Sequence, residues 1–197
     1  MEEKLYSFDE ACDIVVESVA ILGTEYQGIL RKGLKEDRWV DVYENKGKRS
    51  GAYSSGCYDS NPYILMNYQG TLNDVLTLSH EAGHSMNSYL SNQKQAYHDA
   101  DYTIFVAEVA STFNEQLTYE YLYNKAESKA ERLFLLNQQI GAIRSTFFRK
   151  ASIAEFALKI HDMVENHIPL TPDNMKQIYG EMSKKYYGDA FTLTDEA

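Results

Sequence analysis

The pentad His80-Glu81-Ala82-Gly83-His84 constrains this chain more than any other stretch of its sequence. Residues four apart project from one face of an α-helix, because four residues make close to one helical turn. Two neutral imidazoles on that face can bind one Zn²⁺, and the glutamate after the first can reach a water that the metal activates. The pentad therefore predicts a helix that carries two zinc ligands, His80 and His84, and a general base, Glu81.

The residues before the pentad favour a helix. Thr71-Leu-Asn-Asp74 resembles a capping box with Asp in place of the usual Glu, so a helix is expected from Thr71 through the pentad to about Leu90. Gly83 costs this helix about 1 kcal/mol relative to Ala, a cost that close packing would explain. The alternative is that the two histidines are ordinary surface or core residues.

Glu108 is the expected third ligand. It lies in a second expected helix, capped by Asp101 and with an apolar side formed by Ile104, Phe105, Val109, Phe113 and Leu117. Burying a carboxylate among apolar residues is costly unless it is paired, and catalytic zinc usually takes three protein ligands and one water. In the alternative, Glu108 joins Ser111 and Glu115 in a solvated stripe.

Metal-bound histidines normally donate their second ring N–H to an oxygen acceptor. Ser111, Thr112 and Glu115 all lie close enough along the second helix to serve, and the sequence does not choose among them.

Longer stretches resemble the catalytic region of the oligoendopeptidase F family, relatives of thimet oligopeptidase. The matching stretches are Asp37–Tyr43, Gly47–Tyr53, Pro62–Thr71, the pentad, Phe105–Thr112 and Lys184–Gly188. The resemblance covers nearly the whole chain in order. It implies a mainly α-helical, zincin-like core with a small β-sheet beside the zinc helix. It also implies one Zn²⁺ held by His80, His84 and Glu108, with Glu81 as the base that hydrolyses oligopeptides.

The chain departs from this family in three respects. Ala157 stands where the family usually has a second glutamate. Asn87 stands where many members have a further histidine, three residues after the second ligand. Family members also extend beyond both ends of this chain, and past the position of Ala197 they carry Tyr and His residues that stabilise the transition state. We therefore expect a truncated core that binds zinc and cleaves peptides slowly.

Composition indicates a soluble chain of one domain. With 197 residues, a single catalytic-core domain over residues 1–197 is expected, with its sheet at about 38–69, its ligand helices at about 71–125 and C-terminal helices at about 126–187. A net charge of −10 disfavours nucleic acid and anionic lipid as partners. No apolar run approaches a membrane span and no secretory signal opens the chain, so a cytoplasmic location is the expectation.

The remaining segments predict further elements. Ser7 is expected to cap a first helix that breaks near Gly23, and Thr171 to cap a last helix that reaches about Tyr187. Segment 39–43 alternates as a strand would, segment 63–68 is also expected to be a strand, and Pro62 at its start suits an edge position. An edge strand at 63–68 or 51–53 could pair with the backbone of an extended peptide, whereas an internal strand could not.

The sequence thus predicts a zinc metalloendopeptidase core that acts on oligopeptides. Two alternatives remain open. One is a zinc-binding fragment or module without catalytic activity, which peptidase turnover would distinguish. The other is a zinc carboxypeptidase, which would release single residues from a C-terminus rather than cleave an internal bond.

Overall fold

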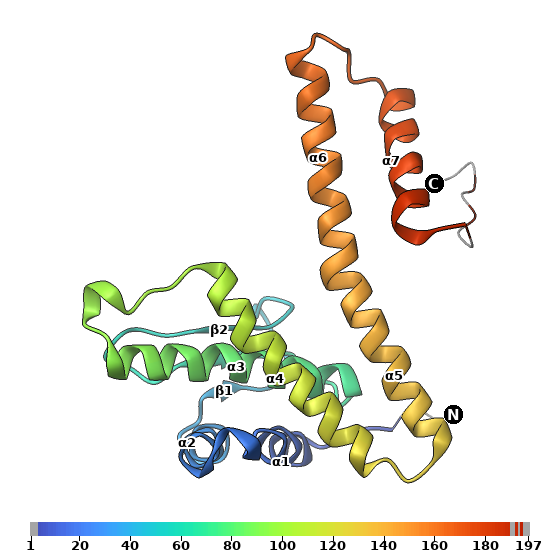
Figure 1. Ribbon diagram of the computed structural model, residues 1–197. Coiled ribbons are helices and arrows are strands. Elements are labelled where there is room, and N and C mark those ends of the chain that lie inside the picture. Colours follow the sequence, from blue (N-terminus) through green and yellow to red (C-terminus); the bar gives the residue numbers. More distant parts are fainter. Residues whose placement is uncertain (1–3, 190–191, 193, 195–197) are drawn as a thin grey trace. The chain divides into compact units, whose positions relative to one another are not determined.

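The computed structural model describes residues 4–189, 192 and 194 and is mainly α-helical with one small sheet, as expected (Figure 1). It divides into two compact units, Met1–Arg132 and Leu133–Ala197. The single catalytic-core domain stays a prediction, and each unit is described by itself. Among the helices of the described residues, none has both the length and the apolar character that crossing a membrane requires.

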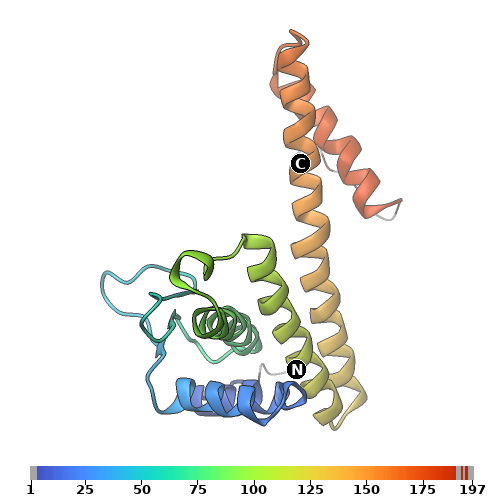
Figure 2. The same ribbon diagram turned by 60° about the vertical axis from the view of Figure 1, so that its left-hand side comes forward.

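The long helix α3 forms the centre of the first unit. The elements of this unit are α1 (Phe8–Ser18), the 3₁₀ turn η1 (Ala20–Leu22), α2 (Thr24–Lys35), β1 (Val40–Asp41), β2 (Tyr53–Ser55), β3 (Tyr63–Leu65), α3 (Leu72–Lys94), the 3₁₀ turn η2 (Tyr97–Asp99) and α4 (Ile104–Lys125). Helices α1, α2 and α4 and strands β2 and β3 all pack around α3 (Figures 1 and 2). The buried core includes Val15, Leu30, Trp39, Ile64 and Leu78.

Local side-chain caps fix where the helices begin. Thr71 and Asp74 form the expected capping box at the start of α3, and Ser7 forms another with Glu10 at the start of α1. The expectation for α4 was wrong. Its N-cap is Thr103, which makes no side-chain cap, while the Asp101 carboxylate accepts a hydrogen bond from the backbone N–H of Tyr102.

The sheet has the order β1-β3-β2. Strand β3 is therefore internal, parallel to β1 and antiparallel to β2, which excludes segment 63–68 as the edge strand and leaves the alternative that it is internal. Pro62 lacks a backbone N–H, but it precedes the first paired residue of β3, so the missing donor does not interrupt the ladder. Strand β2, which begins at Tyr53, lies at an edge.

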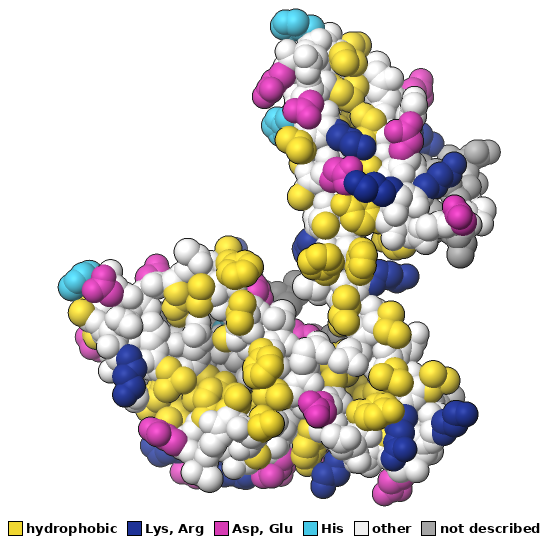
Figure 3. Space-filling model, in the orientation of Figure 1, with side chains coloured by type: hydrophobic (Ala, Val, Ile, Leu, Met, Phe, Trp, Pro, Cys, Tyr) yellow, Lys and Arg dark blue, Asp and Glu magenta, His cyan; other side chains and the backbone are white. Residues whose placement is uncertain are grey.

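Helix α4 turns its polar side inward, contrary to the sequence prediction. Ser111, Asn114 and Thr118 are buried against α3, whereas Phe105 is 77% exposed. Of the five residues expected to form its buried apolar side, only Leu117 is buried; the exposed ones are Ile104, Phe105, Val109 and Phe113. In Figure 3, hydrophobic side chains accordingly lie on the surface over α4.

The second unit is a helical hairpin. Helix α5 (Lys129–Ile143) enters it from the first unit and continues through a π-helical segment, η3 (Arg144–Phe148), into α6 (Arg149–Glu165), which packs against α7 (Pro172–Tyr187). Thr171 caps α7 as expected. The α6–α7 contact includes an edge-to-face pair of Phe156 and Tyr179 and an ion pair of 2.8 Å between Lys185 Nζ and Glu155 Oε2.

Candidate metal centre

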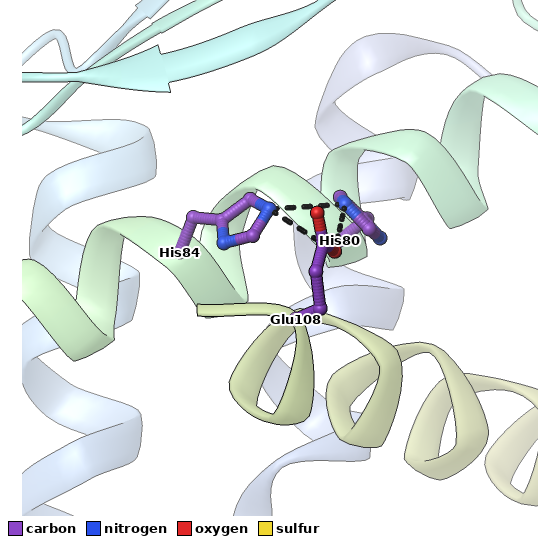
Figure 4. A group of neighbouring side chains, drawn as sticks. All are labelled: His80, His84 and Glu108. Atoms are coloured by element: carbon purple, nitrogen blue, oxygen red, sulfur yellow. Dashed lines mark hydrogen bonds and ion pairs between the residues drawn. The ribbon is translucent and has the colours of Figure 1, made fainter. Parts of the chain in front are cut away.

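Three side chains from two helices converge on one point. His80 and His84 extend from α3, and Glu108 extends from α4 (Figure 4). Their ligand atoms lie close together: His80 Nε2 is 3.0 Å from His84 Nε2 and 3.4 Å from Glu108 Oε2, and the third pair is 3.7 Å apart. The structure thus brings together all three residues that the sequence singled out as ligands.

Gly83 allows the two helices to approach closely enough for this convergence. A Cβ atom at position 83 would lie 2.7 Å from both the carbonyl oxygen of Ala110 and the Cα atom of Ser111, inside van der Waals contact with the α4 backbone. A residue larger than glycine would therefore push α4 away from α3. Because Glu108 is carried by α4, the small residue between the two histidines also sets the position of the carboxylate.

Glu115 is the oxygen acceptor that the sequence could not identify. Its Oε1 lies 2.5 Å from His80 Nδ1, so that nitrogen carries the proton and the lone pair of Nε2 faces the other two ligand atoms. The other two candidates bond Glu108 instead. The Ser111 hydroxyl donates to the Glu108 carboxylate at 2.9 Å, and the Thr112 hydroxyl donates to the Glu108 backbone carbonyl at 2.5 Å.

Glu81 is buried beside the three residues. Its side chain reaches only 6% exposure, and the backbone N–H of Ser54 on β2 bonds its carboxylate. The hydroxyl of Ser54 also bonds that of Ser85 on α3, at 2.7 Å. The edge strand is thus tied to the pentad helix at the position of the expected base.

Burial and neighbouring charges shift the pKa values in this group. Burial raises the pKa of Glu81, with the positive charge of His80 opposing it. Burial also lowers the pKa of His84, and a charged His80 lowers it further. For His80, burial would lower the pKa, but the hydrogen bond and the charge of Glu115 outweigh burial and raise it. A bound divalent cation would favour the deprotonated form of each group.

The donor set fits a catalytic divalent metal. Four ligands at tetrahedral angles and 2.0–2.1 Å from Zn²⁺ lie about 3.3 Å from one another. The three separations here, 3.0, 3.4 and 3.7 Å, bracket that length. Two imidazole nitrogens and a carboxylate oxygen are ligand atoms that suit zinc, and a cation between them would pair with all three.

Asn87 occupies the next turn of α3 and does not join the group. Its side-chain Nδ2 is buried and makes no hydrogen bond among the described residues. The three remaining histidines lie elsewhere: His98 pairs with Asp99 on the surface at 3.2 Å, and His161 and His167 lie in the second unit.

The chain matches known proteins over almost its whole length. The family model described as peptidase family M3 matches residues 6–197. The chain is 49% identical to Oligopeptidase PepF of Bacillus subtilis over 190 residues, which cover 96% of this chain and 28% of that protein. It is 44% identical to an oligoendopeptidase F homologue of Borreliella burgdorferi, covering 96% of this chain and 32% of that protein.

A solved structure shows the same fold. The match to a crystal structure of a protein from Chlamydophila abortus has a TM-score of 0.86 and 46% sequence identity, and it covers 98% of this chain and 33% of that one. The chain therefore spans about 30% of the length of the relatives that it matches. Because the family model covers nearly all of its residues, the chain belongs to peptidase family M3.

Proposed function

We propose that this chain forms the zinc-binding core of a metalloendopeptidase that hydrolyses oligopeptides. The observation that carries the proposal is the convergence of His80 Nε2, His84 Nε2 and Glu108 Oε2 within 3.0–3.7 Å, beside the buried carboxylate of Glu81. The names of the relatives, oligopeptidase and oligoendopeptidase, support the substrate class. His80, His84 and Glu108 would hold the metal.

When bound, zinc would polarise the carbonyl of the scissile peptide bond and lower the pKa of a water towards about 7. Glu81 takes one proton from that water as its oxygen attacks the carbonyl carbon. The same carboxylate then delivers the proton to the leaving amine nitrogen as the C–N bond breaks. The Ser54 N–H holds Glu81 in place during both transfers, since it bonds the carboxylate from β2.

The unpaired edge of β2 supports an extended substrate backbone. Among the described residues β2 pairs with β3 alone, so its other side, apart from the Ser54 N–H that bonds Glu81, remains available for a peptide backbone. Recognition through backbone groups does not depend on the substrate side chains. It therefore suits an enzyme that accepts peptides of varied sequence.

Two substitutions test the proposal, one for metal binding and one for chemistry. Glu108→Ala should lower zinc affinity strongly, because it removes one of three ligands, as metal titration would show. Glu81→Gln keeps the size of the side chain and removes the base. It should retain one zinc per chain while kcat for an internally quenched peptide falls about 10²–10⁴-fold.

The outcomes separate the alternative functions. A Glu81→Gln protein with unchanged kcat would exclude Glu81 as the base. A wild-type protein that binds one zinc and cleaves nothing would support the module without catalytic activity. Release of single C-terminal residues, with no internal cleavage, would favour the carboxypeptidase.

A further inference from the structure

A cavity of about 640 Å³ opens in the first unit next to the metal centre. None of the three proposed ligands lines it, so it is separate from the metal centre itself. Four of its lining residues are tyrosines, namely Tyr58, Tyr89, Tyr97 and Tyr102. Asp101 and Asn92 add polar groups to the wall.

Helix α3, which carries two of the proposed ligands, and strand β2, which lies beside Glu81, both continue into this cavity. Residues 56–58 follow directly after Ser55 of β2, and Ser88 lies one helical turn beyond His84 on α3. A peptide that lies along β2 advances about 3.3 Å per residue, and one turn of α3 rises about 5.4 Å. With its scissile bond at the metal centre, such a peptide would place a side chain in the cavity two or three residues away.

Hydrogen bonds hold the tyrosine rings in fixed positions. The Tyr58 hydroxyl donates to the Gln95 carbonyl at 2.7 Å, and the Tyr102 hydroxyl bonds that of Ser88 at 2.5 Å. The rings of Tyr58 and Tyr97 meet edge to face, with centroids 5.5 Å apart. Because these hydroxyls bond the protein, the ring faces are the surfaces left for a ligand.

Asp101 is the only charged residue among the described residues that line the cavity. Asp101 is exposed and accepts a hydrogen bond from the Tyr102 N–H at 2.9 Å, and among the described residues it forms no ion pair. No Lys, Arg or His belongs to the described residues that line the cavity. Aromatic faces attract cations, and a carboxylate pairs with them. An apolar side chain would gain nothing from Asp101.

We propose that this cavity is a subsite for an arginine or lysine side chain of the peptide substrate, bound between the tyrosine rings and the Asp101 carboxylate. The inference rests on the proposed peptidase function. In the proposed function, strand β2 recognises only the backbone of the substrate. The cavity would add a preference for a cationic side chain near the cleaved bond.

The test compares peptides that carry arginine or citrulline, its neutral isostere, at each of three positions on either side of a cleavable bond. Binding is measured to the zinc-loaded Glu81→Gln protein, and kcat/KM is measured with the wild type. At one position, arginine should bind about two- to fivefold more tightly than citrulline, as expected for an exposed ion pair. The difference should shrink as salt is added.

Substitutions in the Glu81→Gln background locate the effect. Asp101→Asn keeps an oxygen for the Tyr102 N–H and should abolish the preference for arginine. Asp59→Asn is the matched control, because Asp59 is an exposed acid of the neighbouring loop that does not line the cavity. Tyr97→Leu should weaken arginine binding, and Tyr97→Phe should restore it, because a phenyl ring keeps the aromatic face.

Three results would overturn the subsite: equal binding of arginine and citrulline at every position, an unchanged preference in Asp101→Asn, or no detectable binding of either peptide. The proposed function fails differently. Loss of wild-type turnover with a retained preference in binding would reject the peptidase and keep the cavity. Turnover without any preference would reject the cavity and keep the peptidase.

Discussion

At the scale of single residues, the candidate metal centre depends on two glutamates whose carboxylates face different ring nitrogens of the histidines. Glu108 and Glu115 lie two turns apart on α4, and both face α3. Glu108 contacts the converging Nε2 atoms, whereas Glu115 contacts only the far side of the His80 ring. In the proposed site, Glu108 would therefore bind the metal and Glu115 would orient His80.

Glu115 should act as a positioning residue. Glu115→Ala removes the acceptor for the Nδ1 proton of His80, so zinc affinity should fall about 10–100-fold. Glu115→Gln keeps an amide oxygen in place and should recover part of the affinity. Competition titration with a chelator measures both. Glu120→Ala, an exposed change on the same helix, is the control. Equal affinities for Glu115→Ala and the control would show that His80 needs no such partner.

At the scale of elements, the α3–α4 contact decides the geometry of the centre. Gly83 lies where the α4 backbone approaches most closely, and hydroxyl groups link the same two helices nearby: the Thr118 hydroxyl is 2.8 Å from that of Ser79. At these positions the α3–α4 interface is therefore formed by a glycine and by hydroxyl groups.

Two glycine substitutions should change stability in opposite directions. Gly83→Ala places a methyl group against backbone that cannot rotate away, and should cost about 1–3 kcal/mol of unfolding free energy despite the higher helix propensity of Ala. Gly28→Ala in α2 meets nothing within 4 Å and should add up to about 1 kcal/mol. Urea unfolding of the metal-free proteins measures both. A stabilised Gly83→Ala protein would mean that α4 can move away freely.

At the scale of the molecule, both units expose large apolar side chains. Ile104, Phe105, Val109 and Phe113 are exposed on α4, and the second unit exposes Phe147 and Leu158. Contiguous apolar patches on soluble proteins usually mark contact surfaces.

We expect the isolated chain to self-associate through α4. The associated fraction should rise with concentration in sedimentation velocity experiments, and Phe105→Lys with Val109→Lys should reduce it. Ile21→Lys is the matched control, since Ile21 is 80% exposed in η1, away from α4. A chain that remains monomeric at high concentration, or a control that acts as strongly as the α4 pair, would exclude this surface as the cause.

Much of the local structure was predictable from the sequence. The capping boxes at Ser7 and Thr71 and the cap at Thr171 involve residues three positions apart, so the pattern that predicts them also contains their partners. The spacing of the pentad likewise fixes two imidazoles on one face of any helix that includes it. That spacing covers His80 and His84 only, whereas Glu108 was expected from its place in a second, apolar helix.

Only the tertiary structure decided which side of each element is buried. The apolar residues of α4 indicated an inward face, yet α3 meets the polar face, because Glu108 and the buried hydroxyls must reach the pentad. The internal position of β3 depends on pairing with two segments that lie 8 to 24 residues away in the chain, which a local residue pattern cannot specify. The choice of Glu115 over Ser111 and Thr112 followed from the rotation of α4 about its axis. Hydrogen bonds between residues close together in the chain can be predicted from the sequence, because both partners lie in one short pattern. Contacts between distant segments depend on how whole helices pack.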